Sequence, residues 1–270
     1  MDFIKSHWED SAARWGTAHA ASWGDLYAIR LEIETVGSHL QDGDTVLDAG
    51  CGNGFALIEQ CATHAFTKVV GIDFSEKMIE AARERLRGTP VLCPIEFHVG
   101  DLRALPFADK SFDVVYTTRA LINLPTWADQ QVAILECLRL AKPGGRVVLS
   151  EAFWEPLCKL NALRAVLGLA PLVEHDFNRY LKKSALSAFL NSRDIPFSSC
   201  DFSSVYYAGT RLLREVIQDN PKLDYYSSEL NAEFYRLERR FSGGDIGIQQ
   251  LFLLSKSRGA SREEPTERGA

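Results

Sequence analysis

The chain has 270 residues, of which 46% are hydrophobic and 24% are charged, a composition typical of a globular protein and unlike a disordered one. Its formal net charge of −6 provides no long-range attraction for nucleic acid or for an anionic membrane surface, so we expect neither as a partner. No apolar run approaches the ~20 residues that cross a bilayer, and the N-terminal segment lacks the basic and apolar parts of a signal peptide.

Six cysteines are scattered along the chain, at positions 51, 61, 93, 137, 158 and 200. None forms a Cys-x-x-Cys pair, and no histidine stands at ligand spacing, so we expect no metal site and no disulfide framework. Free thiols indicate a reducing compartment and therefore a cytoplasmic protein, although the even count leaves disulfide pairing open.

Residues 1–43 form a first zone that is rich in tryptophan. Apolar residues in its second half recur at helical spacing, which predicts an N-terminal helical cap. Trp15, Trp23 and Arg30 are candidates for closing this cap over a ligand. Simple packing of the cap onto the sheet is the alternative.

Residues 44–255 form the main predicted domain, in which short apolar runs alternate with longer amphipathic stretches. Such alternation of strands and helices predicts a parallel sheet with helices on both faces. The expected strands lie at 45–48, 69–73, 95–99, 112–116 and 146–150. The expected helices between them lie near 55–64, 76–87 and 129–141.

The C-terminal part adds a helix near 184–192, a strand near 197–203 and a last strand at 249–254. The roughly 40 residues between these two strands, about 204–245, are helical and rich in tyrosine, and they are too long for a hairpin loop. We interpret them as an insertion that forms an aromatic lid, with a homodimer contact as the alternative. The polar tail at 256–270 is expected to be disordered.

The strongest chemical signal is the segment Val46-Leu47-Asp48-Ala49-Gly50-Cys51-Gly52-Asn53-Gly54, which follows a predicted strand and precedes a helix. Its glycines permit a sharp turn and close approach of a ligand, and the helix N-terminus favours an anionic group. Asp73 ends the next strand, where a carboxylate can accept both hydroxyls of a ribose. Alone, these features suit any nucleoside cofactor, including NAD.

Further motifs narrow this choice. Asp48, ahead of the glycines, can bind a cationic amino group, and Gly100-Asp101-Leu102 places a second carboxylate after the third strand. The fourth strand leads into Thr117-Thr118-Arg119-Ala120-Leu121-Ile122-Asn123, and a helix, a glycine turn and a fifth strand follow. This series, in this order from Asp44 to Glu151, resembles the class I S-adenosylmethionine-dependent methyltransferases.

The resemblance implies an α/β fold: a doubly wound, seven-stranded, mostly parallel sheet of the Rossmann-like methyltransferase type, whose last strand is antiparallel. It implies S-adenosyl-L-methionine as cofactor. By matching positions, it assigns the methionine end to Asp48 and the backbone of Gly50, Cys51 and Gly52, the ribose to Asp73, the adenine to Phe74, Asp101 and Leu102, and the methionyl side to the backbone of Thr118 or Arg119.

A finer resemblance extends beyond the cofactor half. The segments Ser22–Asp25, Leu121–Pro125 and Glu174–Tyr180 are similar to a bacterial subgroup that acts in sugar or secondary-metabolite pathways. This similarity implies a small-molecule acceptor.

Transfer to a hydroxyl would use a general base, for which His175 and Glu151 are the candidates. His175 lies in a polar run after the fifth strand, and an exposed loop histidine is its alternative reading. Glu151 ends the fifth strand at the sheet edge where open α/β folds bind ligands, and a surface carboxylate is its alternative. Tyr180 and Tyr206 could orient a substrate hydroxyl or simply pack.

Arg119 stands among apolar neighbours directly after the fourth strand, where an unneeded cation would be costly. It could belong to a set that binds a carboxylate or phosphate of the substrate. The other members of that set are Asn123, Arg179 and Arg211. The alternatives are an ion pair with Glu151 or Asp101, or a solvated side chain that lies over apolar surface.

These observations together predict a methyltransferase that acts on a small molecule, at oxygen, by in-line displacement. The alternatives are N- or C-methylation of a small molecule, methylation of protein or RNA, a non-catalytic subunit that binds S-adenosylmethionine, and a nicotinamide dehydrogenase. Asp101 and the motif after the fourth strand disfavour the last of these.

Overall fold

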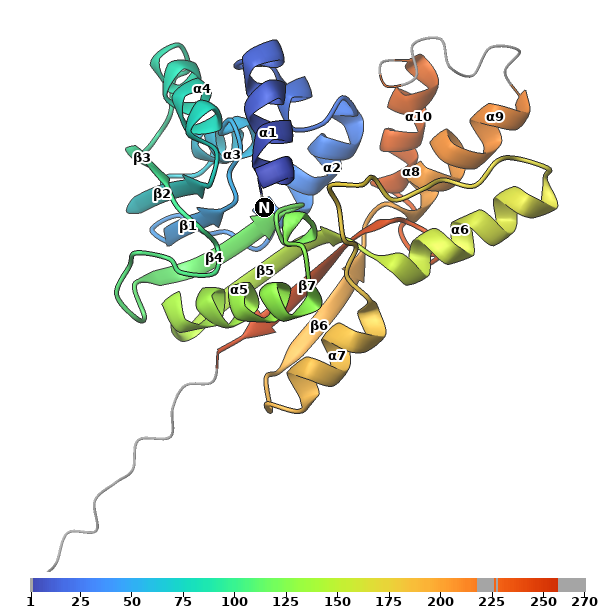
Figure 1. Cartoon of the computed structure of the whole chain (residues 1–270). Coiled ribbons are helices and arrows are strands. Elements are labelled where there is room, and N and C mark those ends of the chain that lie inside the picture. Colours follow the sequence, from blue (N-terminus) through green and yellow to red (C-terminus); the bar gives the residue numbers. More distant parts are fainter. Residues whose placement is uncertain (1, 218–225, 227, 257–270) are drawn as a thin grey trace, which may run out of the picture.

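A seven-stranded mixed sheet forms the centre of the protein, described here from a computed structural model for residues 2–217, 226 and 228–256 (Figure 1). The strand order is β3-β2-β1-β4-β5-β7-β6. β7 runs antiparallel to both of its neighbours, and the other strands are parallel, which confirms the predicted fold class. The strands are β1 Thr45–Ala49, β2 Lys68–Asp73, β3 Ile95–Val99, β4 Phe112–Thr118, β5 Ala141–Ala152, β6 Phe197–Asp201 and β7 Gln249–Ser255.

Helices cover both faces of the sheet: α5 and α7 lie below it in Figure 1, and α2, α3 and α4 lie above it. The helices before β5 are α1 Asp2–Trp15, η1 His19–Ala21, α2 Leu26–Gly37, α3 Phe55–Thr63, α4 Glu76–Arg87, η2 Leu121–Asn123 and α5 Trp127–Leu140. Those after it are α6 Trp154–Val166, α7 Lys183–Asn191, α8 Ser204–Ala208, the π-helical η3 Gly209–Leu213, α9 Arg214–Ile217 and α10 Glu229–Glu238.

The central strands are apolar without alternation because both of their faces are buried. Val46, Leu47, Val114 and Val115 are all fully inaccessible to solvent. Parallel strands between two helical layers read as continuous hydrophobic runs for this reason.

The order of the strands reverses between β1 and β4, which are neighbours although β2 and β3 intervene in the chain. The strands diverge from this point in two directions, and their carboxyl ends meet at one edge. Ligands of open α/β sheets bind at such a switch point. The glycine loop after β1 and the segment after β4 both lie there.

The predicted insertion between β6 and β7 consists of α8, η3, α9 and α10 in its described parts. Gly209 allows η3 to touch α10, because a Cβ at that position would lie 2.0 Å from the Phe234 ring. Residues 218–225 and 227 lie outside the described residues, as does the predicted tail beyond Lys256.

Two sequence-based expectations need correction. β5 already begins at Ala141, so the segment expected as a glycine turn belongs to the strand, with Gly144 at φ 77°. The helix α6 after β5 was not predicted, because its apolar residues show no clear one-sided pattern.

All six cysteines are free thiols, as predicted. Among the described residues, no helix combines the length and apolar character needed to span a membrane.

Candidate active site

The glycine loop after β1 is held tightly by the neighbouring strand. The amides of Gly50 and Cys51 both donate to the carbonyl of Ile72, at 2.7 and 2.9 Å. Gly50 (φ 96°) must be glycine, because a Cβ would lie 2.3 Å from the Ala120 methyl group. These two amides were expected to donate to a ligand, but they already donate within the protein. Gly50 and Cys51 can therefore shape a ligand site without donating hydrogen bonds to the ligand from their amides.

Two adjoining cavities of about 50 and 60 Å³ lie over this loop. Both are lined by Ser22, Gly50, Gly52, Thr118 and Arg119. The first also contains Asp48, Cys51 and Glu32, and the second contains Asp73, Phe74, Leu102, Asn123 and Trp8. The structure thus gathers every sequence-predicted cofactor residue except Asp101.

Asp48 is buried at the end of β1 and accepts a hydrogen bond from the Tyr116 hydroxyl at 3.0 Å. Its other oxygen, Oδ1, has no hydrogen-bond partner among the described residues. Burial raises the pKa of Asp48 to about 8. A cationic ligand group in this cavity would remove that cost, because it would favour the ionised carboxylate.

Asp73 ends β2 and is 8% exposed. Its oxygens accept hydrogen bonds from the Gly52 and Ser75 amides, both at 2.9 Å. Burial raises its pKa to about 6, while these two amides oppose the shift. Ser75, and not Asp73, caps α4, since its hydroxyl accepts from the Met78 amide at 3.1 Å.

Asp101 does not line either cavity. Its carboxylate is held by the Arg103 guanidinium, with Nη2 at 2.6 Å, and this pairing lowers the pKa of Asp101. Arg103 also reaches Asp129 at 2.9 Å. Leu102 lines the second cavity in its place, so the segment is positioned as predicted but its acid faces a structural partner.

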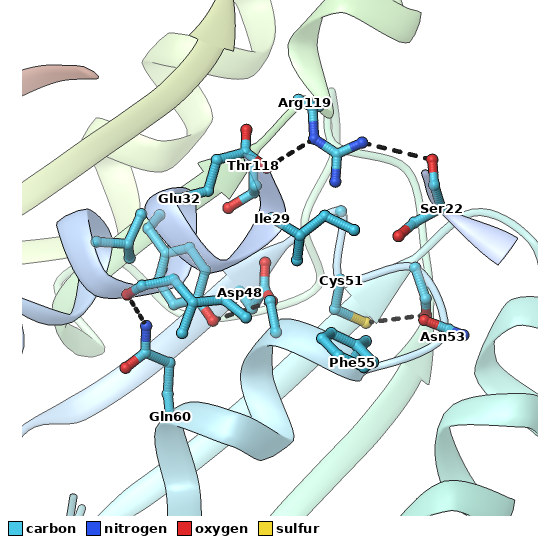
Figure 2. Close-up of a pocket in the computed structure, with 16 residues that line it drawn as sticks. Ser22, Ile29, Glu32, Asp48, Cys51, Asn53, Phe55, Gln60, Thr118 and Arg119 are labelled. Atoms are coloured by element: carbon cyan, nitrogen blue, oxygen red, sulfur yellow. Dashed lines mark hydrogen bonds and ion pairs between the residues drawn. The ribbon is translucent and has the colours of Figure 1, made fainter. Parts of the chain in front are cut away.

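Arg119 pairs with Glu32, and not with Glu151 or Asp101, which were considered as alternative partners. Its Nε lies 2.9 Å from Glu32 Oε2 (Figure 2). Its guanidinium lies over the Trp23 ring, 4.8 Å from the ring centroid. Arg119 has a φ of 51°, a conformation that is rare for residues other than glycine and that concentrates at functional sites.

Glu151 is fully buried, which corrects its assignment as a general base. It accepts from the Thr117 hydroxyl at 2.7 Å and from the amides of Ala120 and Leu121 at 3.1 Å. Burial raises its pKa to about 7. A group enclosed by its own chain in this way positions the turn after β4, and it lines none of the cavities described here.

A third, larger cavity of about 480 Å³ adjoins the first two. Ser22 and Arg119 line all three cavities, so they mark the junction. The larger cavity contains His175, Tyr180 and Arg211. Its aromatic lining comes from Trp8, Trp23, Phe177, Tyr180, Tyr207 and Tyr226.

Tyr206 and Arg211 differ from their predicted roles as substrate ligands. Tyr206 is fully buried outside the cavity and donates to Asp25 at 2.6 Å. Arg211 reaches the cavity, but its Nη2 forms an ion pair with Asp25. Arg179 donates to the backbone carbonyls of its own loop and does not line the cavity. Of the expected anion-binding set, Arg119 and Arg211 line this cavity, Asn123 lines the second one, and Arg179 lines neither.

Two histidines enclose an aromatic ring at the wall of the large cavity. Phe177 stacks on His175 at 5.2 Å and on His7 of α1 at 3.9 Å. Burial, followed by the nearby His175, lowers the pKa of His7. This stack connects the N-terminal helix to the loop before α7.

Of the three cap residues predicted to close over a ligand, Trp23 lines the third cavity and the other two line none of the three. Trp15 is exposed and Arg30 lies at a separate groove, whereas Trp8 lines both the second and third cavities. The Asn53 side chain donates to the carbonyls of Gly16 and Ala18 at 3.0 and 2.7 Å, which ties the cap to the glycine loop.

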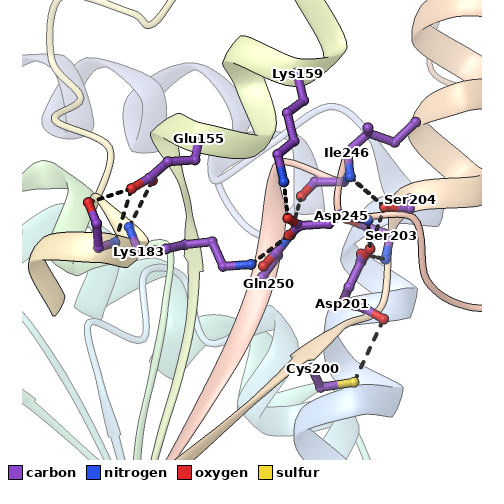
Figure 3. Close-up of polar contacts among 12 residues, drawn as sticks. Glu155, Lys159, Lys183, Cys200, Asp201, Ser203, Ser204, Asp245, Ile246 and Gln250 are labelled. Atoms are coloured by element: carbon purple, nitrogen blue, oxygen red, sulfur yellow. Dashed lines mark hydrogen bonds and ion pairs between the residues drawn. The ribbon is translucent and has the colours of Figure 1, made fainter. Parts of the chain in front are cut away.

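A cluster of charged and polar side chains lies at the base of the insertion, away from the cavities, and its members pair with one another (Figure 3). Asp245 forms ion pairs with Lys159 of α6 and Lys183 of α7, and it accepts from Gln250 at 3.0 Å. These bonds lower the pKa of Asp245 although its partial burial acts against them. The cluster anchors the chain where it returns to β7.

The first two cavities fit the nucleoside cofactor that the sequence resemblance implies. Asp48 Oδ1 and Trp8 Nε1 are buried there without a hydrogen-bond partner among the described residues. A Cβ on Gly52 would meet nothing within 4 Å, so the loop faces open space at that point. A buried acceptor and a buried donor beside open space are suited to a polar ligand.

His7, Trp8 and Glu32 belong to this site but were not predicted from the sequence. Glu32 carried a usable signal, because it interrupts the buried face that Ala28, Ile29 and Val36 form on α2. An acid on such a face is rarely buried without a partner. His7 and Trp8 carried no comparable signal.

Comparisons with known proteins agree with this geometry. Residues 46–145 match the family model described as a methyltransferase domain. The ubiquinone biosynthesis O-methyltransferase of Hahella chejuensis is 30% identical over 224 residues, which cover 80% of this chain and 89% of that protein. The 27-O-demethylrifamycin SV methyltransferase of Amycolatopsis mediterranei is 38% identical over 117 residues, which cover 43% of this chain and 42% of that protein.

The chain spans less than half the length of several of the curated relatives that it matches. Among solved structures, the magnesium protoporphyrin IX methyltransferase of Synechocystis, with bound SAH, superposes with a TM-score of 0.57. That match has 18% sequence identity and covers 93% of this chain and 94% of the other. At this identity the likeness concerns the fold.

Proposed function

Because the chain belongs to the class I S-adenosylmethionine-dependent methyltransferases, we propose that it transfers the methyl group of S-adenosylmethionine to an oxygen atom of a small, largely apolar acceptor. The observation that carries this proposal is the cavity of about 480 Å³ that adjoins the two small cavities over the glycine loop, with Ser22 and Arg119 lining all three. Its volume lies in the range of small-molecule sites, roughly 300–1,000 Å³.

The chemistry of the cavity wall supports an apolar ring system as acceptor. Aromatic and aliphatic residues together make up most of its lining, and its two arginines are each paired with a buried acid, Arg119 with Glu32 and Arg211 with Asp25. A strongly anionic acceptor would have to compete with these ion pairs. We therefore favour an intermediate of natural-product type over a sugar phosphate. The names of both relatives above refer to methylation at oxygen, which supports an oxygen acceptor.

S-adenosylmethionine, when bound, supplies an electrophilic methyl group on a sulfonium. Asp73 would accept from the ribose hydroxyls, and Phe74 and Leu102 would flank the adenine. Asp48 would receive the amino group of the methionine end. Alignment and exclusion of water by these groups provide most of the acceleration in such a displacement.

The cap must move for this cofactor to enter. The two cavities over the glycine loop measure about 50 and 60 Å³, which together fall below the roughly 300 Å³ that small-molecule sites need. Trp8 covers one of them from α1. We propose that α1 and η1 swing outward to admit the cofactor and then close over it.

His175 is the base that we propose for a hydroxyl acceptor, since it faces the large cavity whereas Glu151 does not. The Phe177 ring, stacked between His175 and His7, would fix its orientation. Tyr180, which also lines the cavity, has a pKa raised to about 12 by burial and would act as a hydrogen-bond donor.

Labelled donor tests the proposed function. The protein would be incubated with S-adenosylmethionine that carries a labelled methyl group and with host extract, and the products separated into small-molecule, protein and RNA fractions. We expect label in the small-molecule fraction. Label in protein or RNA, or no label despite demonstrated donor binding, would contradict the proposal.

His175→Gln tests the base once an acceptor is identified. We expect kcat to fall about 100-fold and its dependence on pH to flatten, because general bases contribute roughly 10²- to 10⁴-fold. His98→Gln is the matched control, since His98 is exposed on β3 and pairs with Glu96. An unchanged pH profile in His175→Gln would exclude this role.

A further inference from the structure

Two buried carboxylates from distant parts of the chain face the same small cavity. Glu32 of α2 is 1% exposed and Asp48 of β1 is 2% exposed. Both line the cavity over the glycine loop, as Figure 2 shows. Glu32 Oε1 and Asp48 Oδ1 each lack a hydrogen-bond partner among the described residues.

Such a pair is unfavourable without a ligand. A buried acceptor that has lost water and gained no donor destabilises the folded state. Repulsion adds to this cost, from Asp25 at Glu32 and from Asp73 at Asp48. Arg119 satisfies only half of Glu32, because its Nε donates to Oε2 and leaves Oε1 open. The cavity therefore contains two acids and one arginine, which pairs with Glu32 only, and this excess of acid favours a cation.

Arg119 itself is held in an unusual position. Its amide donates to Ser150 at 2.8 Å, which contributes to holding the φ of 51°. Its Nη1 donates to the Ser22 carbonyl at 3.4 Å, and Nη2 makes no hydrogen bond with the described residues. The guanidinium can therefore hold Glu32 on one side and offer a donor to an anionic group on the other.

We infer that Glu32 is a cofactor-binding residue: Glu32 Oε1 and Asp48 Oδ1 together accept hydrogen bonds from the α-ammonium group of the methionine end, and Arg119 donates to its α-carboxylate. This inference rests on the proposed function, because it assumes that S-adenosylmethionine is the donor. The sequence motif around the glycine loop indicates only one acid for the amino group, Asp48. The inference adds Glu32 as a second. It also makes α2 of the N-terminal cap part of the cofactor site.

The charge pattern matches the zwitterionic methionine end better than it matches water or a metal ion. An α-amino acid presents one cation and one anion on the same carbon, and the cavity presents two acids beside one guanidinium. The ribose and adenine carry no charge, and the second cavity, which contains Asp73 and Phe74, suits them.

Ligand analogues separate this inference from a general loss of structure. Binding of S-adenosylhomocysteine and of 5′-methylthioadenosine, which lacks the amino-acid end, would be measured by calorimetry. In Glu32→Gln we expect the affinity for S-adenosylhomocysteine to fall about 10- to 100-fold, as for loss of a charged hydrogen bond. The affinity for 5′-methylthioadenosine should change less than about twofold, since that ligand does not reach Glu32.

Glu34→Gln is the matched control on the same helix, because Glu34 points away from the cavity and pairs with Arg239 at 3.1 Å. We expect it to bind both ligands as the unmodified protein does. Equal losses for both ligands in Glu32→Gln, or no loss for S-adenosylhomocysteine, would overturn the inference.

A measurement on the unmodified protein remains decisive if Glu32→Gln does not fold. The protein should prefer S-adenosylhomocysteine over its analogue without the α-amino group by more than about 10-fold, and equal affinities would refute the inference. If the unmodified protein binds neither adenosyl ligand, the proposed function itself fails.

Discussion

Two acidic regions of this protein show opposite electrostatics. Around the glycine loop, Asp48 and Glu32 are buried, each with one oxygen that has no hydrogen-bond partner in the described part of the chain. Burial raises their pKa values to about 8 and about 7. At the base of the insertion, Asp245 has two lysine partners and a glutamine, and its pKa is lowered (Figure 3).

This difference distinguishes acids that stabilise the fold from acids that are placed to bind a ligand. Asp245 is complete within the protein, so its bonds stabilise the fold without any ligand. Asp48 and Glu32 are incomplete, and they reduce stability until a ligand supplies the missing donors. Strongly shifted acids in a cavity are therefore candidates for function, whereas shifted acids in ion-pair networks need not be.

The largest expected effect concerns the ribose site. Asp73→Ala should weaken S-adenosylhomocysteine binding by about 100-fold or more, because a carboxylate that accepts two hydroxyls contributes roughly 1.5–3 kcal/mol per bond. Calorimetry would measure this loss, with Asp245→Asn as the control that leaves affinity unchanged. Undiminished binding in Asp73→Ala would contradict the ribose assignment.

Asp48→Asn should move affinity and stability in opposite directions. We expect ligand affinity to fall about 10- to 50-fold, because a neutral amide interacts more weakly with an ammonium group. The free protein should melt about 2–4 °C higher at pH 8, because the variant no longer buries a carboxylate that tends to ionise. Calorimetry and thermal melting would measure the two effects, and a lower melting temperature would contradict the reading of Asp48 as an incomplete site.

The pH dependence of the free protein should follow from the same acids. Their folded pKa values, about 8 for Asp48 and about 7 for Glu32 and Glu151, lie above the ordinary values of 3.8 and 4.5. Their contribution to stability is therefore full below about pH 4 and is lost as the pH rises toward 8. Tyr116 and Asp73 face Asp48, and Arg119 and Asp25 face Glu32, so all four groups influence this range.

Thermal melting without ligand between pH 5 and 8 would measure this decline. We expect a decrease of several degrees in the unmodified protein and a smaller decrease in Asp48→Asn. A melting temperature that rises over this interval in both proteins would show that other groups dominate.

The smallest expected effect lies at the insertion. Asp245→Asn should lower the melting temperature by about 2 °C, because its ion pairs are partly exposed and each contributes less than about 1 kcal/mol. Binding of S-adenosylhomocysteine should stay the same, as measured in parallel with Asp73→Ala. A large loss of affinity would mean that the two regions are coupled.

The sequence predicted the sheet and the cofactor loop well because both depend on local patterns. The apolar runs of β1, β2 and β4 reflect the burial of both faces of these strands. The glycines after β1 are required by the backbone conformation of the turn that they form. The antiparallel last strand came from the family resemblance and is confirmed.

The acceptor side was harder to predict because its contacts join distant segments. Glu151 stands where a ligand-binding acid would, yet the turn after β4 folds back and encloses it. Likewise Tyr206 is separated from Asp25 by most of the chain, and their hydrogen bond becomes evident only once the insertion is placed. Spacing along the chain carries no information about such pairs.

A crystal structure with S-adenosylhomocysteine bound would test the assignment of the cavities most directly. We expect the ribose on Asp73, the α-ammonium group between Asp48 and Glu32, and the sulfur at the junction that Ser22 and Arg119 form with the large aromatic cavity. A methionine end that avoids both acids, or a sulfur that points away from this cavity, would contradict the assignment.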